Sequence, residues 1–214
     1  MKLEHLVRQP LVKTAQPPLL LLLHGYGSDE EDLFSFASEL PHEYLIVSAR
    51  APIPMQPYGN AWYAINFDAD ENKFTNTAQA IASRDLIADF IDEIHQHYST
   101  HPQKVTLIGF SQGAILSYAV ALSYPQKVNR VVALSGYLNK EILKEDYLNN
   151  DLNQLKVFIS HGNVDQVIPV EWAQKAPGIL QNIGIQPIYK EYPAGHGIHP
   201  QNFKDLLDFV GNRQ

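Results

Sequence analysis

The chain has 214 residues, 45% of them hydrophobic, which is enough to bury one sizeable core, and we expect a single domain over residues 1–214. Sixteen Lys and Arg residues against 23 Asp and Glu residues give a net charge of −7, and no run of five basic residues occurs. This balance argues against a nucleic-acid partner. The absence of cysteine excludes disulfides, thiolate metal sites and a cysteine nucleophile.

Short apolar runs alternate along the chain with longer segments of helical length. Most of these runs are apolar throughout, as expected for strands of a parallel sheet that is covered on both faces. The order predicts an α/β fold with a mostly parallel central sheet and helices on both faces. The predicted strands cover residues 19–23, 44–48, 105–108, 128–134, 155–160 and 187–191. The predicted helices cover residues 30–40, 77–98, 112–124, 170–183 and 201–210.

The apolar runs are too short to cross a membrane. The amino-terminal segment has no run of signal-peptide length, and the strongest apolar stretch, residues 19–23, is far shorter than a bilayer requires. We therefore expect a cytoplasmic protein without stable membrane insertion.

The sequence Gly109-Phe110-Ser111-Gln112-Gly113 joins a predicted strand to a predicted helix. GxSxG is typical of the nucleophile elbow, a strained turn that tolerates only small residues two positions to either side of the serine. Such a serine needs a base, a group that orients the base, and donors for the developing oxyanion. The motif in this context predicts Ser111 as a nucleophile. The alternative is that the glycines serve only close packing of strand and helix.

In enzymes with a nucleophile elbow, the acid and then the histidine follow the serine along the chain. Three histidines follow Ser111, namely His161, His196 and His199. His161 ends a predicted strand before any plausible acid has appeared, and His199 precedes Pro200 as expected of a local turn residue. His196 lies in a glycine-flanked loop between the last strand and the last helix, where an imidazole can reach over the sheet edge. We predict His196 as the base, with His199 as the weaker alternative.

Asp165 is the only carboxylate in the loop that follows the predicted strand 155–160. Beside His196 it would hold the imidazole in the productive tautomer and stabilise the imidazolium. The alternative is that Asp165 only forms an Asx turn before the helix predicted from residue 170.

An oxyanion hole requires two backbone N–H groups, one of them from the residue after the nucleophile. Gln112 supplies that amide. The glycines of His24-Gly25-Tyr26-Gly27 let the chain bend toward the site after the strand 19–23, so Tyr26 is the expected second donor and Gly27 a neighbouring possibility. The same segment could also serve as a turn into a helix capped by Ser28 or Asp29.

Residues 51–76 form a long connection that is rich in proline and aromatic residues. Loops of this length in compact domains are functional or disordered, and the pair Trp62-Tyr63 argues against disorder. Trp62 and Tyr63, with Tyr58 and Phe67, are candidates to line an acyl pocket, although they could equally be plugs that pin the loop to the core.

The remaining histidines do not suggest a metal site. His95, His97 and His101 do not share one helix face, and neither an HExxH motif nor an acidic calcium loop occurs. We expect no metal and no cofactor.

Together these motifs resemble the phospholipase/carboxylesterase family of the α/β-hydrolases, which includes acyl-protein thioesterases, lysophospholipases and small bacterial carboxylesterases. The resemblance covers nearly the whole chain. It implies a triad of Ser111, Asp165 and His196, an oxyanion hole at Tyr26 and Gln112, metal-independent hydrolysis, no large cap domain, and a possible homodimer. The matching segments are LLLLHGYGSDEEDL, SARAPIP, AWYAINFD, VTLIGFSQGAILSYAVAL, VVALSGYL, VFISHGNVDQVIPVEWA and YPAGHGIHPQNFKDLLDFV.

Three departures from the family pattern concern the substrate more than the chemistry. Ala114 replaces the last glycine of the usual GFSQGG, Tyr26 stands in an HGYGSD segment where many thioesterases have HGLGD, and Trp62-Tyr63-Ala64 replaces Trp-Phe-Asp. We therefore do not extend the protein-depalmitoylating activity of family members to this chain. We expect a serine carboxylic-ester hydrolase acting on small or medium-chain acyl esters. A thioesterase or lysophospholipase with the same triad is the alternative, and a non-catalytic binding module is the alternative from another class.

Overall fold

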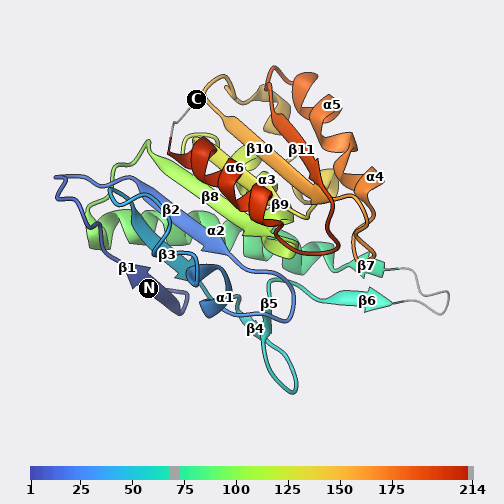
Figure 1. Ribbon diagram of the computed structural model, residues 1–214, viewed down its shortest axis with the longest axis horizontal. Helices are drawn as coiled ribbons and strands as arrows, with labels where there is room; N and C mark the ends of the chain where they lie inside the picture. The colour runs from blue at the N-terminus through green and yellow to red at the C-terminus, as the bar shows by residue number, and fades with distance from the viewer. Residues whose placement is uncertain (68–72, 212–214) are drawn as a thin grey trace.

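The computed structural model describes residues 1–67 and 73–211. A central sheet contains β1 (His5–Arg8), β2 (Leu19–Leu23), β3 (Leu45–Ala49), β8 (Val105–Phe110), β9 (Arg130–Leu134), β10 (Lys156–Gly162) and β11 (Ile188–Tyr192). Their spatial order is β1-β3-β2-β8-β9-β10-β11 (Figure 1). Every neighbouring pair is parallel except β1 with β3. The mostly parallel sheet predicted from the sequence is confirmed.

Helices cover both faces of this sheet. On one face lie α2 (Thr77–Tyr98), α3 (Gln112–Ser123) and α5 (Lys175–Gln181), and α4 (Val170–Ala173) contacts β10 and α5. On the other lie α1 (Glu31–Phe34) and α6 (Pro200–Val210), and Figure 1 shows α6 in front of the sheet with α2 and α3 behind it. The core is accordingly in two layers, so Leu19, Leu21 and Leu23 of β2 face one layer while Leu20 and Leu22 face the other. This double coverage explains why β2 is an unbroken run of leucine.

The register of the parallel strands brings the functional segments to one edge. Leu23 pairs with Gly109, so the loop after β2 starts beside the turn that carries Ser111. Gly162 pairs with Tyr192, so the loops after β10 and β11 also start side by side. Because parallel strands all end at the same edge, residues far apart in sequence meet there.

Two helix predictions were wrong in extent. The segment 170–183 is divided into α4 and α5, because Pro177 has no N–H to donate to the carbonyl of Ala173, where α4 ends. The segment 30–40 forms only the short α1, after which the Ser35 hydroxyl donates to the Asp32 carbonyl at 2.6 Å and competes with the backbone hydrogen bonds of a longer helix.

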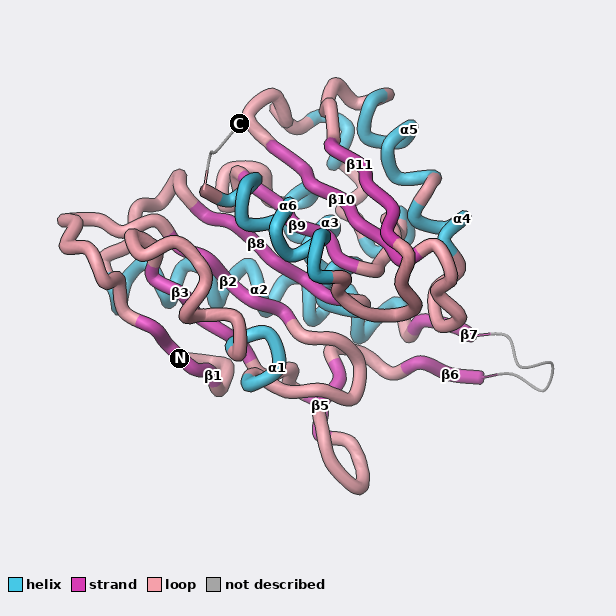
Figure 2. Tube along the Cα trace, in the orientation of Figure 1, coloured by secondary structure: helices cyan, strands magenta, loops and turns pink. Residues whose placement is uncertain are grey.

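The long connection 51–76 contains two antiparallel hairpins that the sequence did not predict. They consist of β4 (Ile53–Pro54) with β5 (Asn60–Ala61), and β6 (Ile65–Phe67) with β7 (Lys73–Thr75). Strands of two or three residues are too short to display a two-residue periodicity. Both hairpins project from the edge of the molecule (Figure 2). Two 3₁₀ turns, η1 (Lys140–Ile142) and η2 (Tyr147–Asn149), follow β9.

No helix in the described part of the chain combines the length and the apolar character needed to cross a bilayer.

Candidate active site

Ser111 sits on a strained turn between β8 and α3. Its φ and ψ angles are 54° and −114°, in a region that residues other than glycine rarely adopt. The glycines of the motif are required by close backbone contacts: a Cβ at Gly109 would lie 2.2 Å from the Gly113 carbonyl oxygen, and a Cβ at Gly113 would lie 1.9 Å from the Leu23 carbonyl oxygen. The turn therefore packs against both α3 and β2, and it holds the serine hydroxyl at the edge of the sheet.

The alanine that departs from the family motif is accommodated by a second glycine. A Cβ at Gly136 would lie 2.6 Å from the Cβ of Ala114. Residue 136, which follows β9, therefore leaves the space that the Ala114 methyl group fills.

The structure brings Ser111, His196 and Asp165 together. His196 Nδ1 lies 2.7 Å from Asp165 Oδ2, and His196 Nε2 lies 3.0 Å from Ser111 Oγ. Because a carboxylate can only accept, Nδ1 must carry the hydrogen, which leaves Nε2 to accept the proton of the serine hydroxyl. Asp165 has a fully buried side chain, whereas that of His196 is 17% exposed. The arrangement can thus deprotonate the Ser111 hydroxyl while it keeps the acid out of water.

The loops that carry Asp165 and His196 are tied to each other by their backbones. The amide of Asn163 donates to the Tyr192 carbonyl at 2.9 Å, and the amide of Val164 donates to the Ala194 carbonyl at 3.2 Å. Gly162 permits this approach, because a Cβ there would lie 2.2 Å from the Gly195 carbonyl oxygen. The spacing between acid and base is therefore set by backbone contacts.

Asp165 makes both the triad contact and the Asx turn that were predicted as alternatives. Its Oδ1 accepts from the amides of Val167 at 2.8 Å and Ile168 at 3.0 Å, while Oδ2 faces His196. Burial alone raises the pKa of Asp165, but the hydrogen bonds from His196, Ile168 and Val167 outweigh it and hold the pKa below its ordinary value. The group is thus an ionised acceptor at neutral pH.

The amides of Tyr26 and Gln112 are available as donors at the same edge. Neither donates to another group within residues 1–67 and 73–211. Gly27 is the less suitable candidate, because its amide already donates to the Asn60 carbonyl at 2.9 Å. Asp29 meanwhile accepts from the Glu31 amide at 2.9 Å, so the segment also forms the turn into α1.

His24 fixes the loop that carries Tyr26. Its Nδ1 donates to the Gly25 carbonyl at 2.7 Å and its Nε2 accepts from the Ala51 amide at 3.0 Å. Burial lowers the pKa of His24, in agreement with a ring that must keep one nitrogen unprotonated to accept that bond.

The Trp62 side chain lies in the protein interior, next to the segments that carry Tyr26 and Gln112. Its side chain is fully buried and its indole N–H donates to the His24 carbonyl at 2.9 Å. Its backbone amide donates to Gln112 Oε1 at 3.1 Å, and Gln112 Nε2 donates to the Tyr63 carbonyl at 2.7 Å. Trp62 is not among the residues that line the cavity beside Ser111, and its hydrogen bonds hold the segments that carry Tyr26 and Gln112.

A cavity of about 250 Å³ opens beside Ser111 and His196. Tyr63 lines it, whereas Tyr58 is 80% exposed and is not among the lining residues. The side chain of Phe67 lies outside the described part of the structure. Sequence reasoning missed Tyr137 and Trp172 in the cavity wall. The centroids of their rings lie 5.1 Å apart. The complete lining is Tyr26, Tyr63, Ile65, Thr75, Ser111, Gln112, Ile115, Tyr137, Val167, Ile168, Trp172 and His196.

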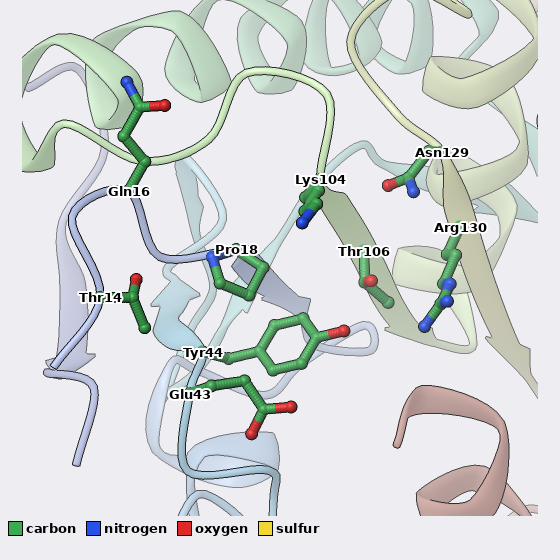
Figure 3. Close-up of a pocket in the computed structure, with 9 residues that line it drawn as sticks. All are labelled: Thr14, Gln16, Pro18, Glu43, Tyr44, Lys104, Thr106, Asn129 and Arg130. Atoms are coloured by element: carbon green, nitrogen blue, oxygen red, sulfur yellow. The ribbon is translucent and has the colours of Figure 1, made fainter. Parts of the chain in front are cut away.

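A second hollow has a volume of about 380 Å³, and Figure 3 shows the residues that line it. It is lined by residues at the amino ends of strands, among them Pro18 before β2, Lys104 and Thr106 at β8, and Arg130 at β9. Ligands of open parallel sheets bind at the carboxyl ends of the strands. The smaller cavity beside Ser111 is therefore the candidate site.

The other histidines near the site have local contacts. His199 Nδ1 accepts from the Gln201 amide at 3.1 Å at the start of α6, as expected of a turn residue. His161 is buried next to Asp165, with Nε2 3.2 Å from Oδ2. In the described ranges, no three His, Asp or Glu side chains form a cluster that could hold a metal ion.

A parallel sheet with a strained serine turn after β8, and with an acid and a histidine on the loops after β10 and β11, defines an α/β-hydrolase. The comparison with known families agrees: the phospholipase/carboxylesterase family model matches residues 7–213, and the chain belongs to this family.

Relatives and solved structures resemble the chain over nearly its whole length. Acyl-protein thioesterase 1 of Candida albicans is 24% identical over 223 residues, covering 96% of each chain. Acyl-protein thioesterase 1 of Kluyveromyces lactis is 28% identical, covering 92% of each chain. The crystal structure of esterase PE8 has a TM-score of 0.83 at 25% identity and covers 99% of each chain. The Bacillus cereus carboxylesterase has a TM-score of 0.85 at 18% identity, covers 100% of this chain and 95% of its own, and shows the shared fold.

Proposed function

We propose that the protein hydrolyses carboxylic esters through an acyl-enzyme on Ser111. His196 Nε2 removes the proton of the Ser111 hydroxyl as Oγ attacks the ester carbonyl, and the amides of Tyr26 and Gln112 receive the oxyanion. His196 then protonates the departing alcohol, which leaves the acyl group on Oγ. Water, deprotonated by the same nitrogen, attacks the acyl-enzyme and releases the carboxylic acid and the free serine.

The observation that carries this proposal is the double contact of one imidazole, 3.0 Å from Ser111 Oγ and 2.7 Å from Asp165 Oδ2. A serine hydroxyl becomes an activated nucleophile when a histidine lies between it and a buried carboxylate, which is the geometry seen here. The family membership is in agreement with this chemistry.

The cavity beside Ser111 supports an uncharged acyl group of small or medium size as the substrate. Among the described residues that line it there is no Asp, Glu, Lys or Arg, and aromatic and aliphatic side chains form most of its wall. A volume of about 250 Å³ is at the small end for ligand pockets. We therefore expect chains of few carbons to react faster than long ones.

The decisive experiment is a panel of nitrophenyl esters of increasing acyl length, tested on the wild type and on Ser111→Ala. Wild type should be labelled by a fluorophosphonate, and Ser111→Ala should lose labelling and several powers of ten in kcat. A wild type that neither reacts with the probe nor hydrolyses any ester would identify a non-catalytic binding module instead.

The base is tested separately by pH. Hydrolysis requires the unprotonated Nε2 of His196, so kcat/KM should fall when acid protonates that nitrogen. A profile that is flat between about pH 5 and 9 would contradict the assignment of His196 as the base.

Thioester hydrolysis is the second candidate, because two relatives that align over more than nine-tenths of their length are named acyl-protein thioesterase 1. The same triad can expel a thiolate as readily as an alcohol. Rates on oxygen esters and thioesters of identical acyl groups separate the two activities, and a preference for the thioester at every chain length would favour this candidate.

A further inference from the structure

A buried histidine that the proposed mechanism does not use lies behind the contact between Asp165 and His196. His161 is near the carboxyl end of β10, and its side chain has no exposed surface. An imidazole buried in this way is costly unless its polar atoms find partners. Its contacts therefore indicate what the ring does there.

His161 Nε2 makes two contacts, both to the turn that contains the acid. It lies 2.8 Å from the carbonyl oxygen of Ile168 and 3.2 Å from Oδ2 of Asp165. Because the carbonyl oxygen can only accept, Nε2 must carry a hydrogen. This N–H donates to Ile168 and also faces the carboxylate oxygen that accepts from His196 Nδ1.

Ile168 is held at both of its backbone polar groups. Its amide donates to Asp165 Oδ1 at 3.0 Å, and its carbonyl accepts from His161. Ile168 is 8% exposed, so without His161 the carbonyl would lose its partner where little water can replace it. The two bonds anchor the turn from opposite sides, and this fixes the plane of the Asp165 carboxylate.

His161 is not an alternative base. A ring without exposed surface cannot meet a substrate, and its Nδ1 has no hydrogen-bond partner within residues 1–67 and 73–211. All of its hydrogen bonding is directed through Nε2 at the turn.

We propose that His161 is a positioning residue, whose Nε2–H holds the Ile168 carbonyl and faces Asp165 so that Oδ2 is presented to His196. The inference rests on the proposed ester hydrolysis. It predicts that the loss of this N–H lowers the rate of the chemical steps and has little effect on substrate binding. The reason is that His196, if displaced from its productive position, removes the serine proton more slowly.

Three variants test the role through kcat and KM for a short nitrophenyl ester. His161→Leu, which removes the N–H, should lower kcat by about 10- to 100-fold with little change in KM. His161→Gln, whose amide nitrogen reaches the position of Nε2, should recover most of kcat. His161→Asn, whose amide reaches only as far as Nδ1, should not. The matched control is His95→Leu on α2, which should retain wild-type kinetics.

Wild-type kinetics in His161→Leu would overturn the positioning role, and so would equal losses in the Gln and Asn variants, since the side chain would then only fill space. If His161→Leu does not fold, the comparison of Gln with Asn decides. A wild type that hydrolyses no ester sinks the proposed function and this inference together. If the wild type is active and the His161 variants have the same kcat and KM as the wild type, only the inference is overturned.

Discussion

The Gln112 side chain connects the nucleophile helix to the segment that carries Trp62: its Oε1 accepts from the Trp62 amide at 3.1 Å, while its Nε2 donates to the Tyr63 carbonyl at 2.7 Å. In the proposed mechanism, one residue thus offers its backbone amide to the oxyanion and uses its side chain to hold the wall of the site. Both side-chain bonds are buried, so neither backbone group has water as a substitute partner.

Replacing Gln112 with Leu should destabilise the fold while the backbone amide of residue 112 remains. Two buried backbone groups would lose their partners, and we expect the free energy of unfolding in urea to fall by about 2–4 kcal/mol. Gln96→Leu, at an exposed position of α2, is the control and should change it by less than about 0.5 kcal/mol. Equal effects at the two positions would show that the side-chain bonds contribute nothing.

Replacing Trp62 with Phe should lower kcat although Trp62 does not line the cavity. The variant loses the indole N–H that donates to the His24 carbonyl at 2.9 Å, and with it one support of the loop that carries Tyr26. A displaced oxyanion donor reduces kcat more than binding, so we expect a loss of about tenfold with little change in KM. Tyr58→Phe, at an exposed ring, should behave as wild type. An increase in KM alone would instead indicate direct substrate contact by Trp62.

Gly113→Ala should destabilise the protein severely, because the added Cβ would lie 1.9 Å from the backbone oxygen of Leu23 and neither α3 nor β2 can move independently. We expect a loss of at least about 3 kcal/mol in the free energy of unfolding. Gly178→Ala is the matched control in α5: a Cβ there meets nothing within 4 Å, so this variant should gain about 0.5–1 kcal/mol. A tolerated Gly113→Ala would contradict the close contact of α3 with β2.

The lowered pKa of Asp165 predicts a contribution to stability that depends on pH. Since the folded-state pKa is below the ordinary value, the ionised group stabilises the fold at neutral pH, and this contribution is lost as the pH falls through the folded-state pKa. The difference in unfolding free energy between wild type and Asp165→Asn should therefore be largest near pH 7 and shrink below about pH 4. A difference that stays constant down to pH 3 would show that the carboxylate is not stabilised in the folded state.

The two hairpins and the cavity wall show where local sequence information ends. β6 and β7 are three residues each, and Tyr137 and Trp172 belong to segments separated by 35 positions (172 − 137) that meet only across the sheet edge. Trp62 and Tyr63 are adjacent in sequence, yet one supports the site from behind and the other lines the cavity. Composition cannot separate them, because both are buried aromatic residues in the same loop.

Local sequence patterns were sufficient to predict the α/β architecture, the strained turn at Ser111 and the order of acid and histidine, because a buried parallel strand, a glycine-flanked turn and chain order are local features. Three contacts could be recognised only in the folded chain: His161 Nε2 lies 3.2 Å from Asp165 Oδ2, Gln112 accepts from the Trp62 amide, and the amide of Gly27 donates to Asn60. Each of these contacts depends on the register of parallel strands and on the path of the loops between them. That register is fixed by packing on both faces of the sheet, which no short stretch of the chain encodes.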